Sequence, residues 1–140
     1  MSSNKRGSML PPPPKPPTSL SSSVTIPDHA SLIGTNLITI HSHTVLHPRA
    51  KLNSSFAPIT IGSQCIISER SSVGMLHFPS PEQAAGVTME NYVVVEVGAV
   101  VEASRIGEGT IIEVNARVGR GAVLGKVSHC VDSKCRILSC

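Results

Sequence analysis

The chain has 140 residues, enough for one compact domain, and its composition is 40% hydrophobic with no Trp, one Tyr and two Phe. A core with so few rings must be built from Ile, Val, Leu and Ala, which disfavours nucleic-acid platforms that stack bases on exposed aromatic side chains. The formal net charge of +3 matches three basic residues near the start, Lys5, Arg6 and Lys15, so the remainder is balanced and gives no reason to expect a nucleic-acid partner. We expect no membrane insertion and no signal peptide, because no long apolar run or charged-then-apolar start occurs.

Residues 1–23 are predicted to form a disordered tail. Six prolines lie between Pro11 and Pro17, and the flanking segments are rich in Ser. Such a composition buries too little apolar surface to offset the entropy lost on ordering. A proline run favours polyproline II, the conformation that SH3-type domains bind, but a solvated extension is the favoured interpretation.

From Val24 onward, aliphatic residues recur every six positions. A helix repeats at about 3.6 residues and a strand at two, so this period indicates a short strand followed by a tight corner. Three such units make a triangular coil of about 18 residues, and coils stack at the ~4.8 Å strand spacing. Residues 24–140 are therefore predicted to be an all-β parallel β-helix of five to six coils, a solenoid too narrow for large rings. The inward positions are expected to be Ile26, Leu32, Ile38, Ile40, Leu46, Leu52, Ile61, Ile67, Val73, Val95, Val101, Ile106, Ile112, Val118, Leu124, Val131 and Ile137.

Two segments interrupt the period. Asn53 to Pro58 is rich in turn-forming residues and fits a loop at a corner. Residues 75–92 break the repeat outright and are predicted to leave the solenoid wall as an excursion loop, since Pro79 and Pro81 cannot donate to a strand ladder. Because this loop holds the only Tyr and one of the two Phe, it is the expected partner-contact segment, against the alternative that it only packs on a coil. The residues proposed for that contact are Leu76, His77, Phe78 and Tyr92.

Hexapeptide solenoids include zinc enzymes and acyltransferases, and we weighed both chemistries. A catalytic zinc site needs three protein ligands, but His41 and His47 occupy the same position of successive units and should lie a corner apart. An acyltransferase needs an exposed histidine base, for which His77 has the only suitable setting. Cys130, Cys135 and Cys140 are spaced too widely for a zinc ribbon and are expected to be reduced thiols packed in the wall. We therefore predict no catalytic residue, no metal and no cofactor.

The segment from Ile40 to Leu52 resembles the opening coil of the dynactin subunit 6 family. The likeness continues through Pro58 to Ile67, Val95 to Gly98, the five-residue step to Ile106, and Ile112 to Arg120, with the interrupting loop at a matching place. This resemblance implies a single-stranded left-handed parallel β-helix without catalytic activity, in the pointed-end complex of dynactin. The implied neighbours are dynactin subunit 5, the pointed-end actin-related protein and dynactin subunit 4. It also implies a cytoplasmic, cytoskeleton-associated protein that supports dynein-driven transport along microtubules and the attachment of cargo adaptors.

The chain departs from that family at its end. It stops at Cys140, where the family has a further coil and a C-terminal helix along the solenoid. The last coil would then expose an apolar cross-section, so we expect the isolated chain to self-associate or to need a capping partner. The alternative function is a homotrimeric hexapeptide-repeat enzyme, either an acyltransferase or one similar to γ-carbonic anhydrase.

Overall fold

The computed structural model describes residues 15–74, 86–119, 122–131 and, for the backbone, 134–137. These residues form strands and no helix. The described part of the chain therefore has no helix that could span a membrane. Nearly all the strands pair in parallel with the strand one coil away, which confirms the predicted solenoid. The left-handed winding remains what the resemblance implies.

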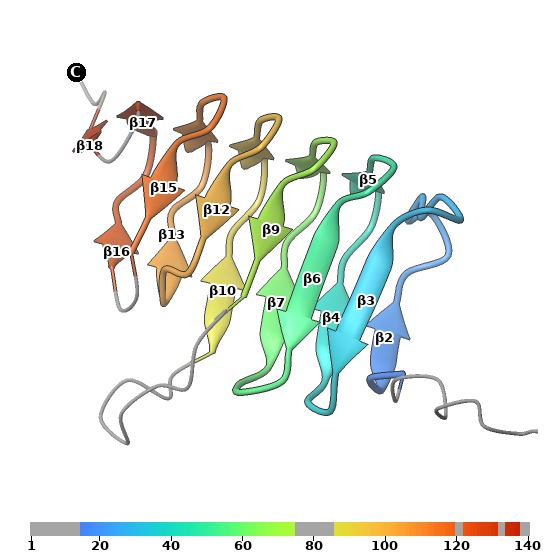
Figure 1. The fold of residues 1–140 in the computed structure, drawn as a ribbon. Helices are drawn as coiled ribbons and strands as arrows, with labels where there is room; N and C mark the ends of the chain where they lie inside the picture. Colours follow the sequence, from blue (N-terminus) through green and yellow to red (C-terminus); the bar gives the residue numbers. More distant parts are fainter. Residues whose placement is uncertain (1–14, 75–85, 120–121, 132–133, 138–140) are drawn as a thin grey trace, which may run out of the picture.

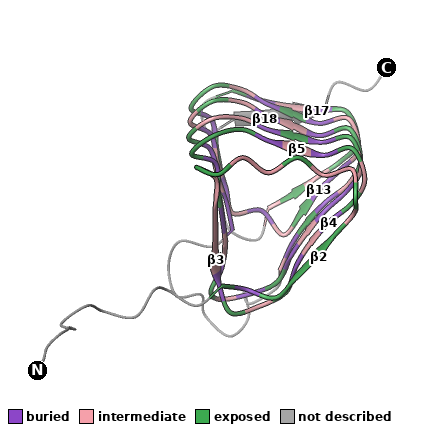
Figure 2. Cartoon of the chain, turned by 90° about the vertical axis from the view of Figure 1, so that its right-hand side faces the viewer, coloured by how far each residue is buried: buried purple, intermediate pink, exposed green. Residues whose placement is uncertain are grey.

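Three sheets form the three faces of the solenoid, which has a triangular outline when viewed end-on (Figures 1 and 2). The first face contains β2 (Thr18–Leu20), β4 (Ile38–Ile40), β7 (Ile59–Ile61), β10 (Val87–Met89), β13 (Arg105–Ile106) and β16 (Val123–Leu124). The second face contains β5 (Val45–Leu46), β8 (Ile66–Ile67), β11 (Val94–Val95), β14 (Ile111–Ile112), β17 (Ser128–Val131) and β18 (Lys134–Ile137). The third face contains β3 (Ser31–Gly34), β6 (Lys51–Ser54), β9 (Ser72–Val73), β12 (Val100–Val101) and β15 (Arg117–Val118).

The core is a set of aliphatic columns that run along the solenoid. Ile40 lies over Ile61, and Ile61 lies over Met89, all with side chains at most 1% exposed. Because successive residues of a strand point to opposite sides, each short strand supplies one or two inward side chains and one or two outward ones. The predicted inward residues from Ile38 to Val118 are all buried, while Ile26, Leu32 and Leu124 pack partly buried against the core.

Small residues line the corner between the first and second faces. Equivalent positions there hold Thr44, Cys65, Val93, Thr110 and Ser128, all buried. The hydroxyl of Thr44 donates to the carbonyl of Gly62 at 2.6 Å, and that of Ser128 to Gly125 at 2.7 Å. These bonds satisfy backbone carbonyls that a tight turn leaves without strand partners. The inward position of this corner is thus filled by small or β-branched side chains in every described coil.

The interruptions of the six-residue period fall at one corner, between the third and first faces. Coil length, measured between stacked residues, is 20 from Leu20 to Ile40 and 21 from Ile40 to Ile61, then 28 from Ile61 to Met89. It falls to 17 from Met89 to Ile106. The predicted loop Asn53–Pro58 falls at this corner, but Asn53 and Ser54 belong to β6, so the loop begins only at Ser55. The longest connection, between β9 and β10, falls at the same corner. The other two corners keep nearly constant spacing.

The structure corrects four other predictions, two on segment boundaries and two on the last coil. Thr18–Leu20 pairs with Ile38–Ile40 as a strand, so the solenoid begins inside the segment 1–23 that was expected to be disordered. The excursion is shorter than 75–92, because Val87–Met89 belongs to the first face. Val131 is 45% exposed, and Cys130 takes the inward position, because the six-residue step from Leu124 continues without the expected slip. Finally, β18 runs antiparallel to β17 instead of starting another parallel unit.

Candidate interaction surfaces

The histidines of the described residues are dispersed. His41 follows β4 on the first face and His47 follows β5 on the second, so they lie a corner apart as predicted. Within the described ranges, no group of three His, Cys, Asp or Glu side chains is placed to hold a metal ion. His77, the candidate acyltransferase base, lies outside the described residues. His129 contacts Glu113 through Nε2 and Oε1 at 2.7 Å, which occupies one of its ring nitrogens.

Of the four residues proposed for partner contact, only Tyr92 is described. Leu76, His77 and Phe78 lie in the segment that the structure leaves undescribed. Tyr92 sits at the corner between β10 and β11, with its side chain 57% exposed and φ of 59°. A large side chain in the left-handed region is strained unless its surroundings hold it. Its backbone N–H donates to the carbonyl of Ser63 at 3.0 Å, which anchors the strained turn to the coil next to it.

Four successive coils of the second face carry aliphatic side chains on its outer side, before the outward position passes to His129. Its outward residues in successive coils are Val45, Ile66, Val94 and Ile111, which lie in register over one another. Ile66 and Ile111 are 39% and 38% exposed. We call these four residues the aliphatic strip. The corresponding positions of the first face hold threonines in three adjacent coils, at residues 39, 60 and 88. The strip is therefore a property of one face, as expected where a partner covers it.

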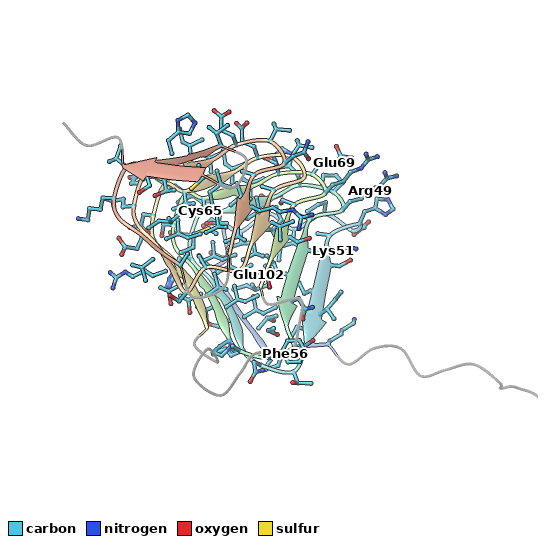
Figure 3. The ribbon with its side chains drawn as sticks, turned by 60° about the vertical axis from the view of Figure 1, so that its left-hand side comes forward. Arg49, Lys51, Phe56, Cys65, Glu69 and Glu102 are labelled. Atoms are coloured by element: carbon cyan, nitrogen blue, oxygen red, sulfur yellow. The ribbon has the colours of Figure 1, made fainter. Side chains whose placement is uncertain are left out.

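A cavity of about 320 Å³ opens at the corner between the second and third faces. It is lined by His29, Ser31, Arg49, Lys51, Arg70 and Ser72. The lining comes from three consecutive coils, because Ser31, Lys51 and Ser72 are stacked in register. Figure 3 shows Arg49 and Lys51 projecting outward from the ribbon on the same side as Glu69. We call these six residues the basic corner. No single residue of the basic corner is distinctive in the sequence. The separations of 20 residues from Ser31 to Lys51 and 21 from Lys51 to Ser72 nevertheless match the coil length.

A second cavity, of about 600 Å³, lies at the N-terminal end of the described solenoid. Its lining includes Lys15, Asp28 and the apolar residues Ile26, Leu32 and Ile33. The strands β2 and β3 are the terminal members of their sheets, so each has an edge without a partner among the described residues. Edges of this kind attract further strands or a covering segment. The end is therefore a second surface suited to contact.

Two ionisable side chains are perturbed by their surroundings. Burial raises the pKa of the Cys65 thiol, although hydrogen bonds from Thr44 and nearby backbone groups act against this. The Arg105 guanidinium, whose Nε donates to Glu90 at 2.9 Å, lowers the pKa of the Glu90 carboxyl. Among the predicted wall thiols, Cys65 is free and buried, but Cys130 is disulfide-bonded, and Cys135 lies opposite it in the antiparallel register. The expectation of reduced thiols is therefore wrong at Cys130. Neither perturbed group adjoins a cluster suited to catalysis.

Comparison with known proteins identifies relatives of the solenoid. Dynactin subunit 6 of Nematostella vectensis is 36% identical over 111 residues, which cover 73% of this chain and 58% of that protein. Dynactin subunit 6 of Danio rerio is 33% identical over 110 residues, which cover 74% of this chain and 55% of that protein. Dynactin subunit 6 of Xenopus tropicalis is 31% identical over 104 residues, which cover 70% of this chain and 50% of that protein. The chain thus spans little more than half the length of the curated relatives it matches. No protein-family model matches it.

A likeness among solved structures is weaker. A Bacillus cereus protein that carries a provisional acetyltransferase assignment is 16% identical, over 87% of this chain and 78% of its own, with a TM-score of 0.36. Likeness at that level carries no argument about activity. The three curated relatives, in contrast, confirm the resemblance to dynactin subunit 6.

Proposed function

From the homology of its solenoid to dynactin subunit 6, we propose that this chain is a non-catalytic structural subunit of a dynactin complex. The observation that carries the proposal is the identity of 31–36% over 104 to 111 residues with three curated relatives of that name. Its place would be the pointed-end complex, beside dynactin subunit 5, the pointed-end actin-related protein and dynactin subunit 4. In the cytoplasm it would support dynein-driven transport along microtubules and the attachment of cargo adaptors.

The aliphatic strip supports a role in assembly. Isolated surface aliphatics are common, but four in register on one face form a contiguous apolar patch of the kind that partners cover. Covering them removes apolar surface from water, worth about 25 cal/mol per Å² before the costs of association. The terminal strands β2 and β3 add unpaired backbone groups at the N-terminal end of the described solenoid. A solenoid bound on these surfaces acts as a spacer between other subunits.

Co-purification tests the proposal. The tagged chain, expressed in cells that contain dynactin, should retain actin-related protein and dynactin subunit 5 in stoichiometric amounts. Substituting Ile66→Asp and Ile111→Asp should weaken that retention, because each places a charge in the aliphatic strip. The matched control is Thr60→Asp with Thr88→Asp, at equivalent outward positions of the first face. Circular dichroism of each variant shows that the solenoid is intact.

The contrary results are specific. If the wild-type chain retains no dynactin subunit, the proposal fails. If it forms a homotrimer in light scattering and carries zinc in metal analysis, the alternative of a hexapeptide-repeat enzyme replaces it. If the two double variants lose partners equally, the aliphatic strip is not the contact and only that part of the proposal fails.

A further inference from the structure

The basic corner spans three consecutive coils and concentrates positive charge on two of them. Arg49 and Arg70 occupy the same corner position in successive coils, and Lys51 lies on the adjoining strand. The backbone N–H of Arg49 donates to the carbonyl of His29 at 3.0 Å, which places His29 at the corresponding corner of the preceding coil. Ser31 and Ser72 lie on either side of Lys51 in the ladder. Three cations, a histidine and two hydroxyls therefore surround one cavity of about 320 Å³.

These charges are poorly neutralised within the chain. None of the described residues that line the cavity is acidic. Neither Arg49 nor Lys51 forms an ion pair within the part of the chain that the structure describes, and Arg70 reaches only Glu69, with Nε 4.0 Å from Oε1. Elsewhere the solenoid pairs a stacked cation closely, as in the Arg105–Glu90 contact. Like charges on neighbouring strands repel, so the arrangement costs stability unless an anion is present.

The backbone at the basic corner adds a second, independent cost. Arg49 has φ of 65° and Arg70 has φ of 59°, in the left-handed region. In the next two coils the same corner position holds Gly98 and Asn115, which tolerate that conformation best. Non-glycine residues such as His43 and Gln64 adopt the same conformation at the other tight corner, so it belongs to the solenoid turn, and at the basic corner it falls on two arginines.

We propose that the basic corner binds an acidic segment of a partner protein in extended conformation. The three cations lie on two adjacent coils, and coils are separated by the ~4.8 Å strand spacing, so a segment running along the solenoid meets a new coil about every one to two residues. Carboxylates of that segment would accept hydrogen bonds from the guanidinium groups of Arg49 and Arg70 and from the Lys51 ammonium. Backbone carbonyls of the segment would accept hydrogen bonds from the hydroxyls of Ser31 and Ser72. An exposed, shallow site on three coils suits a string of carboxylates better than a single phosphate, which is held best within a compact cage. The inference deepens the proposed role as an interaction subunit and rests on it.

The test uses the purified full chain and a fluorescein-labelled hexaglutamate peptide as probe. Fluorescence anisotropy at physiological ionic strength should show saturable binding that weakens as salt is added. Arg49→Gln with Lys51→Gln should raise the Kd at least about tenfold, because two charged contacts are lost. The matched control, Arg117→Gln with Lys126→Gln, removes two exposed cations elsewhere and should change the Kd by less than about twofold.

Several outcomes would overturn the proposal. They are an absence of saturable binding to the wild-type chain, an equal loss in both double variants, and displacement of the peptide by low-millimolar inorganic phosphate. The last would indicate a phosphate site instead of an acidic-segment site. Because this assay contains no other dynactin subunit, its outcome is independent of the co-purification result. Retention of dynactin without peptide binding refutes only the basic corner, and peptide binding without retention refutes only the assembly role.

Discussion

Two adjacent isoleucines of β8 provide a direct test of how the solenoid is stabilised. Ile67 points inward, is fully buried and lies in register between Leu46 and Val95. Ile66 points outward and is 39% exposed. Both residues are isoleucines of the same strand, and both pair with the same two neighbouring strands. Substituting each by Ala therefore isolates the contribution of the interior position.

The expected magnitudes follow from what each substitution removes. Ile→Ala deletes three carbons, worth about 0.8 kcal/mol each when buried. At Ile67 the loss also leaves a cavity, because the coils above and below are held by backbone pairing and collapse little, so the total is about 3–4 kcal/mol. At Ile66 the carbons are partly solvated already and no enclosed cavity remains, so the cost is about 1 kcal/mol.

Urea unfolding followed by far-ultraviolet circular dichroism measures both effects, since the chain has no Trp to report by fluorescence. The difference in unfolding free energy between the two variants should be about 2–3 kcal/mol, with similar denaturant slopes. Equal destabilisation by the two substitutions would refute the assignment of inward and outward positions. A changed slope in one variant would show that unfolding is no longer two-state, and the comparison would then use the midpoints of the separate transitions.

Three further predictions concern local contacts. Gly74→Ala should destabilise the chain by about 2 kcal/mol or more in urea unfolding, because Gly74 has φ of 117° and an added Cβ would overlap a backbone carbonyl, whereas Gly119→Ala, where nothing lies within 4 Å, should be close to neutral. Because the folded-state pKa of Glu90 is lowered, its contribution to stability is present above its unfolded pKa and is lost as the pH falls through the folded pKa. Arg105→Met should therefore lower the free energy of unfolding in urea slightly, by under ~1 kcal/mol, at neutral pH and not in acid. Cys65, buried and with a raised pKa, should resist iodoacetamide in the native chain and react after unfolding in urea, as peptide mass spectrometry would show; rapid labelling of the native chain would contradict its placement in the core.

The period of six was sufficient to predict the solenoid and most of its interior. Stacking requires the inward side chains of successive coils to coincide, so the sequence must repeat them, and the positions from Ile38 to Val118 were correct. The prediction was wrong at Val131. Cys130 was overlooked because cysteine was not counted among the aliphatic residues, although its side chain is fully buried and keeps the six-residue step.

The ends and the surfaces were harder to predict. All three residues of Thr18–Leu20 are exposed and two of them are polar, and the strand is recognisable only by its pairing with Ile38–Ile40, so its composition indicated disorder. The basic corner was invisible in the linear sequence because Arg49 and Arg70 become neighbours only when the coil length is known to be 21 at that point. Coil length varies from 17 to 28, and that variation is set by loops at one corner, which follow no period.

The constancy of stacking has a consequence for the order in which the chain folds. Almost every strand pairs with one that lies a single coil away, so each step closes a loop of 17 to 28 residues and no step requires the two ends of the chain to meet. Closure entropy grows only with the logarithm of loop length, so the longest coil costs about 0.4 kcal/mol more to close than the shortest. Folding can therefore start from any pair of coils and advance one coil at a time in both directions. The longest coil, from Ile61 to Met89, should therefore slow this coil-by-coil growth only slightly.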